Sequence, residues 1–152
     1  MWYRVFGATD AEVDPAAFLE HLQNQELPVA GYFRGDDQGW FAGELRLQAG
    51  ATPVYVERYH TEADDLRDDL NSWAAWVETQ EHDPNHRPLM QRLIGVRQLF
   101  TLRRPLDAAD EVALDKLCDT ACRYLAAATE GVYQADGQGF FAADGALLLH
   151  EY

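Results

Sequence analysis

The types and spacing of Arg58 and His60 are the strongest indication of a ligand-binding or catalytic site in the sequence. These two residues end an alternating stretch in which Val54 and Val56 point to the same side of a predicted strand. Polar side chains that continue an apolar, inward-facing row must be paired or must line a cavity. The pattern therefore predicts a ligand site here, or else a strand whose end twists out into water.

A predicted helix follows this strand and carries possible partners. Arg67 and Asn71 lie four positions apart on one face of it, and Trp76 lies near the edge of that face. The hypothesis is a pocket lined by Arg58, His60, Arg67, Asn71 and Trp76 that binds an anionic or amide-bearing ligand, in a binding or a catalytic role. The alternative is a helix with a solvated flank.

Other reactive residue types are scarce, and no catalytic residue or cofactor is predicted. Ser72 is the only serine and Lys116 the only lysine, and both fall inside predicted helices. Cys118 and Cys122 share a helix face about 6 Å apart, which is too wide for a disulfide. We expect them to be small buried residues rather than a metal or redox pair. The chain carries no phosphate loop, dinucleotide fingerprint, zinc-protease helix or nucleophile elbow.

The most closely spaced metal-ligand types are His82 and His86, which flank Pro84. Imidazoles four positions apart on a helix could hold a metal ion, but proline breaks the helix between them. We favour a solvated helix end here and predict no metal site.

The net charge of −14 sets limits on the partners. A phosphate backbone selects for lysine and arginine, so nucleic acid is not an expected partner. A basic protein is the favoured partner, and the leading hypothesis is a non-enzymatic interaction module, analogous in size and charge to bacterial immunity or antitoxin-type proteins.

The charges are also unevenly spread along the chain. Residues 61–83 are rich in acids, and residues 86–104 hold five arginines and no acid. We expect the two segments to be neighbours that screen each other. The alternative is an arginine surface that meets an anionic ligand or an acidic patch on another copy, as in a homodimer.

No apolar stretch approaches the roughly 20 residues of a membrane-spanning helix. The first residues lack the basic start and the apolar centre of a signal peptide. These features predict a cytoplasmic protein that makes no membrane contact.

Two segments, residues 31–42 and 131–142, resemble each other. Glycine, aspartate, glutamine and phenylalanine recur in both at the same relative positions, around a turn flanked by aromatic residues. Each segment predicts a β-hairpin. In equivalent hairpins Trp40 and Phe140 should face equivalent environments, because strand side chains alternate with a period of two. Asp36 and Asp136 should each accept a backbone N–H within their own turn. A pair of cation-binding loops is the weaker interpretation, since neither turn has the oxygen pattern of a calcium loop.

The predicted elements around the hairpins also repeat. A strand and a helix precede each one, the second helix over about Ala108–Thr129, so residues 1–60 and 96–152 form two β-α-β-β pseudo-repeats with a helical linker over 61–95. The linker contains a long helix over about Glu62–Glu81, with Thr61 as its N-cap, and a shorter helix that ends at Gly95. The fold expected is a single α+β domain over residues 1–152, with helices packed on antiparallel sheet. Whether they cover one face of one sheet or are shared by two small sheets stays open.

Overall fold

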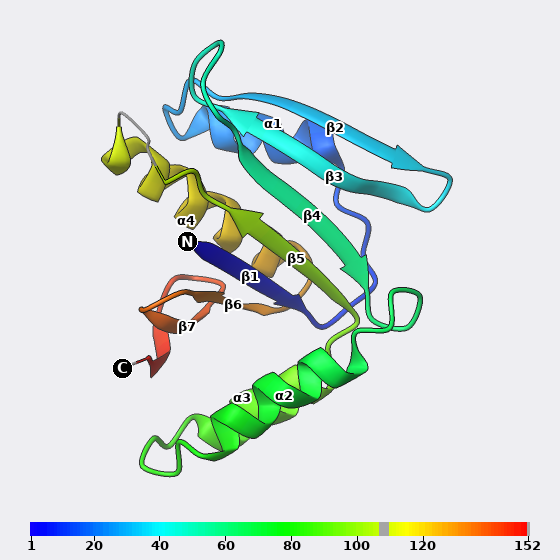
Figure 1. Cartoon of the computed structure of the whole chain (residues 1–152), viewed down its shortest axis with the longest axis vertical. Coiled ribbons are helices and arrows are strands. Elements are labelled where there is room, and N and C mark those ends of the chain that lie inside the picture. The colour runs from blue at the N-terminus through cyan, green and yellow to red at the C-terminus, as the bar shows by residue number, and fades with distance from the viewer. Residues whose placement is uncertain (107–109, 152) are drawn as a thin grey trace.

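The computed structural model describes residues 1–106 and 110–151, which form an α+β structure with four helices packed on one eight-stranded antiparallel sheet (Figure 1). The strands are β1 (Trp2–Gly7), β2 (Ala30–Asp36), β3 (Gly39–Arg46), β4 (Val54–His60), β5 (Gln98–Arg103), β6 (Val132–Ala135), β7 (Gly139–Ala142) and β8 (Leu147–His150). The helices are α1 (Pro15–Asn24), α2 (Arg67–Glu78), α3 (His86–Ile94) and α4 (Glu111–Ala128). The strand order is β2-β3-β4-β5-β1-β6-β7-β8, which leaves β2 and β8 as the edges.

Helices cover both faces of this sheet, so neither predicted arrangement is correct. Helices α1 and α4 pack on one face, and α2 and α3 pack on the other, over β5, β1 and the strands from β6 to β8. The central strands are apolar on both sides: Val5 contributes to the first core and its neighbour Phe6 to the second. Within the described residues, the core under α2 and α3 includes none from β2 and β3, so one face of these strands is uncovered and exposes Tyr32 and Phe41.

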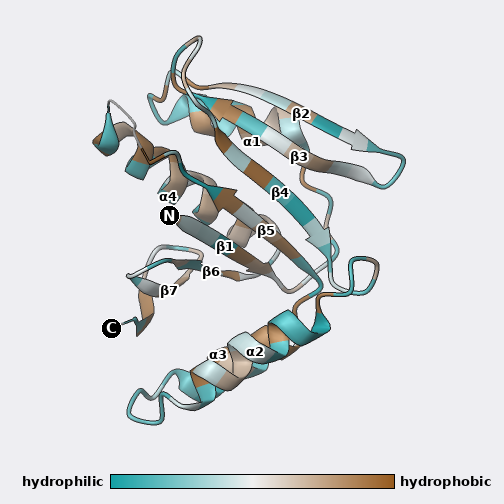
Figure 2. Cartoon of the chain, viewed as in Figure 1, coloured by the Kyte–Doolittle hydropathy of each residue, from teal (hydrophilic) through white to brown (hydrophobic). Residues whose placement is uncertain are grey.

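The hydropathy of the residues follows this division (Figure 2). Apolar residues concentrate in the central strands, and polar residues gather at the β2–β3 turn and in the loop between α2 and α3. Within the residues that the structure describes, no helix is both long and apolar enough to cross a membrane.

The helix after β4 begins later than the sequence predicts. Helix α2 starts at Arg67, and Thr61 is not its N-cap, because the buried Thr61 hydroxyl donates to the backbone oxygen of Val96 at 2.8 Å. Residues 61–65 instead form turns, and Asp65 adopts a left-handed backbone conformation with φ of 55° that interrupts a helix. The start predicted for α4 at Ala108 falls outside the described residues, and Asp110 caps the observed helix by accepting from the Ala113 N–H.

Both predicted hairpins form, as β2–β3 and β6–β7, but the aromatic residues that follow their turns face opposite ways. Trp40 lies in the core under α1 and α4, whereas Phe140 lies in the core under α2 and α3. The expectation that these two residues occupy equivalent environments is wrong. The cause is a bulge in the first hairpin: Arg34 pairs with Ala42 but the next residue pairs with Trp40, so Phe41 is the extra residue.

The hairpins also occupy different places in the sheet. Strand β2 is an edge, whereas β6 lies beside the central strand β1. In the turns, Asp36 accepts the Gln38 N–H at 2.8 Å as predicted, but Asp136 accepts the Trp2 N–H instead. The structure therefore confirms two hairpins and does not confirm a tandem duplication.

Candidate functional site

The end of β4 lies in a fork of the sheet. Strands β3 and β4 pair from Leu45↔Val54 to Ala42↔Glu57 and then separate. Beyond that point β4 continues to pair with β5, as far as His60↔Gln98, while β3 continues to pair with β2. Figure 1 shows the β2–β3 hairpin diverging from β4. A cavity of about 790 Å³ opens at this fork, a size typical of ligand pockets.

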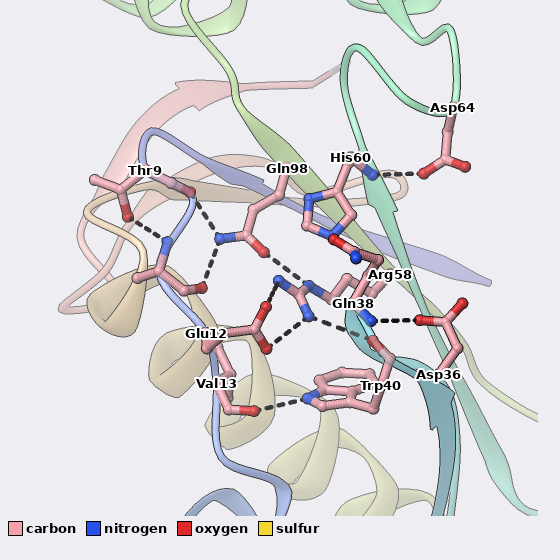
Figure 3. Close-up of polar contacts among 11 residues, drawn as sticks. Thr9, Glu12, Val13, Asp36, Gln38, Trp40, Arg58, His60, Asp64 and Gln98 are labelled. Carbon is pink, nitrogen blue, oxygen red and sulfur yellow. Dashed lines mark hydrogen bonds and ion pairs between the residues drawn. The ribbon is translucent and has the colours of Figure 1, made fainter.

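Arg58 lies at the base of the fork and is fully buried (Figure 3). Its guanidinium forms a bidentate pair with Glu12, with distances of 2.8 Å from Nη2 and 3.1 Å from Nη1. Nε donates to the side-chain oxygen of Gln98 at 3.0 Å, and Nη1 also approaches the backbone oxygen of Trp40. The charge of Arg58 is thus neutralised within the chain.

Two buried side chains hold this arrangement in place. Gln98 donates from its amide to the backbone oxygens of Thr9 at 2.7 Å and Ala11 at 2.9 Å, which ties the loop before α1 to β5. The indole of Trp40 donates to the backbone oxygen of Val13 at 2.7 Å. The loop that carries Glu12 is therefore fixed on both sides of that residue.

Gly39 makes room for the ion pair. A Cβ at this position would lie 2.6 Å from a Glu12 carboxylate oxygen and 2.8 Å from Nη1 of Arg58. The backbone of Gly39 also has φ of +105°, a conformation that other residues rarely adopt. Gly39 is therefore needed both for the turn and for the space that the Arg58–Glu12 ion pair occupies.

His60 lines the cavity with Arg58, so the structure brings these two predicted site residues together. The backbone of His60 has no partner in β3. The loop after β4 folds back instead, and Asp64 accepts the His60 N–H with its carboxylate at 2.6 Å and donates its own N–H to the His60 oxygen at 2.9 Å (Figure 3). Asp64 thereby closes the free edge of β4.

The other predicted site residues lie outside the cavity lining. Arg67 pairs with Glu62 at 2.6 Å and donates to the backbone oxygen of Ile94 at 2.7 Å. Asn71 is exposed on α2, and the ring of Trp76 stacks on Phe140, with centroids 6.1 Å apart. Helix α2 begins too late and runs away from the fork (Figure 1), so only its preceding loop reaches the cavity.

Four residues of the site are not predicted from the sequence, namely Glu12, Gln98, Trp40 and Asp64. Gln98 and Trp40 carry a usable signal, since a buried glutamine or indole needs a hydrogen-bond partner. Glu12 carries none, because it lies in an irregular loop and its side chain is 60% exposed.

The chemistry available elsewhere is limited. Burial raises the pKa of the Cys118 thiol to about 12 and that of Cys122 well above its usual value, so both thiols stay protonated at neutral pH. His86 contacts the backbone oxygen of Asp83 through Nδ1 at 2.7 Å. Among the residues described, no group of three or more histidine, cysteine or acidic side chains is arranged to hold a metal ion.

The cavity therefore combines the size of a ligand pocket with an acidic lining and an internally neutralised arginine at its base. No protein-family model, no curated protein and no solved structure matches the chain.

Proposed function

We propose that this chain is a non-enzymatic interaction module that binds a basic protein partner at the fork of its sheet. The observation that carries the proposal is the charge balance of the cavity lining. Three of its carboxylates, those of Asp36, Glu57 and Asp64, form no ion pair within the part of the chain that the structure describes. They create a negative potential at an open cavity in a chain of net charge −14.

Neutral groups hold these three carboxylates in place. Asp36 accepts the Gln38 N–H, Asp64 accepts the His60 N–H, and Glu57 accepts the hydroxyl of Tyr59. Hydrogen bonds from neutral donors orient a carboxylate but leave its charge uncompensated. A cation that reaches the fork therefore meets acceptors that are already in position.

Two of the three arginines of the lining support the same conclusion. Arg58 is paired with Glu12, and Arg97 is paired with Asp10 at 3.1 Å. Arg34 is the third and pairs with no carboxylate among the described residues, so an anion could reach one uncompensated arginine against three uncompensated carboxylates. The lining thus favours a cationic ligand over the anionic ligand that Arg58 and His60 suggest in the sequence.

The experiment compares decalysine and decaglutamate peptides as probes, by isothermal titration calorimetry at low and physiological salt. Decalysine should bind and should weaken as salt rises, while decaglutamate should give no signal. The double variant Asp36→Asn/Asp64→Asn should weaken decalysine binding by about tenfold, because it removes two carboxylates of the cavity.

The matched control is Asp68→Asn/Asp69→Asn, which removes the same charge from α2 outside the cavity. It should change the affinity less than about threefold, as expected of distant exposed charges. Equal losses in the two double variants would show that net charge alone attracts the peptide. Absence of decalysine binding would contradict the proposed function.

A further inference from the structure

The uncovered side of the fork contains a slot over Ala42. Arg34, Ala42 and Glu57 face one another in register across β2, β3 and β4, and all three line the cavity. Strands two positions apart in a sheet are separated by about 10 Å. Because Ala42 is the small residue in the middle of this row, it leaves space between Arg34 and Glu57.

An aromatic ring forms the wall of this slot on the side of Arg34. Phe41, the extra residue of the bulge, leaves 42% of its surface exposed. The guanidinium carbon of Arg34 lies 5.5 Å from the centroid of the Phe41 ring. Arg34 forms no ion pair among the described residues, so its contact with Phe41 shows that the ring accepts a guanidinium.

A carboxylate forms the opposite wall. Glu57 is exposed and pairs with no cation, and the Tyr59 hydroxyl donates to it. The hydrogen bond to Glu57 is the main cause that raises the pKa of Tyr59 to about 12, and burial adds to it. The hydroxyl therefore stays protonated and continues to orient Glu57 across the physiological range.

We infer that the slot over Ala42 receives one arginine side chain of the basic partner, which stacks on Phe41 and pairs with Glu57. The inference rests on the proposed function and specifies the residue type that is recognised. A planar guanidinium can stack on a ring and form two parallel hydrogen bonds to a carboxylate at once. A lysine ammonium does not stack as a plane and forms no such fork, so arginine is the preferred ligand.

The test uses two peptides of equal charge that differ at one position, Ac-GKGRGKG-NH2 and Ac-GKGKGKG-NH2. The arginine peptide should bind wild-type protein about fivefold more tightly by calorimetry, the ratio that an exposed cation–π contact supports. Glu57→Gln, Phe41→Leu and Ala42→Leu should each reduce that ratio to about one, by removing the carboxylate, the ring or the space.

Arg34→Gln gives a readout that a purely structural role would not produce. Arg34 competes for the Phe41 ring and repels an incoming guanidinium, so its removal should strengthen binding of the arginine peptide. Asp69→Asn is the control, since it removes a charge outside the slot and should leave the ratio at about five. The melting temperature of each variant shows whether it is folded.

The possible outcomes separate the two proposals. If wild-type protein binds both peptides equally, or if the ratio survives in all three slot variants, the slot does not recognise arginine, while a basic partner is still bound. If neither peptide binds and decalysine also fails to bind, the proposed function is wrong and the slot has no partner to receive.

Discussion

Asp136 joins the beginning of β1 to the turn after β6. Its carboxylate accepts the Trp2 N–H at 3.0 Å and the Arg4 guanidinium at 2.8 Å, and Gln134 donates to it at 3.2 Å. Burial acts to raise the pKa of Asp136, but these hydrogen bonds outweigh it and hold the pKa below its usual value. The charged form of Asp136 therefore contributes to stability.

This contribution should depend on pH in one direction. Since the folded state has the lower pKa, the stabilisation is present above the pKa of the unfolded chain, about 4, and is lost as the pH falls through the folded value. Asp136→Asn should lower the urea midpoint at pH 7, and its difference from wild type should shrink toward pH 3. Asp37→Asn, an exposed turn variant, is the control. A difference that stays constant from pH 7 to pH 3 would contradict the expectation.

The candidate site shows what can be predicted for single residues. The alternation of β4 correctly indicates that Arg58 points inward with Val54 and Val56. It does not identify Glu12, which lies 46 positions away in a loop without a period. Side chains on regular elements inherit a direction from the element, whereas a loop residue is placed by the tertiary contacts of its neighbours.

Among the elements, the bulged hairpin β2–β3 decides the shape of the site. Gly35 lies directly opposite the bulge, and a Cβ there would approach the Gly39 oxygen to 2.3 Å and the Trp40 Cα to 2.5 Å. Only glycine allows the two strands to come this close. The bulge turns Trp40 into the core and leaves Phe41 at the cavity.

Gly35→Ala should therefore destabilise the protein by about 2 kcal/mol, because the backbone must move to avoid the overlap. Gly95→Ala is the control, since its Cβ would meet only ordinary contacts of 3.6 and 3.8 Å at the end of α3. Urea denaturation measures both variants. If Gly35→Ala is as stable as Gly95→Ala, the close approach at the bulge is not required.

The hairpins also show why the repeat in the sequence misleads. The resemblance of residues 31–42 to 131–142 correctly predicts two hairpins, because turn chemistry is local. The facing of the aromatic residues after each turn depends on the bulge, and no residue type in the second strand marks it. The strand order cannot be inferred from the repeat either, since β2 lies at an edge of the sheet whereas β6 lies between β1 and β7.

For the whole molecule, the net charge of −14 on 152 residues should lower stability through self-repulsion. Salt screens exposed charges beyond a Debye length of about 10 Å at 0.1 M. Raising sodium chloride from 10 to 150 mM should therefore raise the melting temperature, measured by circular dichroism. A flat or falling response would show that the exposed acids are already balanced by their neighbours.

The position of β1 in the middle of the sheet has a consequence for the order of folding. Its two neighbours are β5 and β6, so Tyr3 pairs with Leu102 on one side and Ala135 on the other. Both partners are synthesised well after β1. Strand β1 must therefore wait for distant parts of the chain, and closure of such distant contacts slows folding. During that interval the apolar residues of β1, Val5 and Phe6 among them, have no sheet to join, and exposed apolar surface of this kind favours aggregation of the incomplete chain.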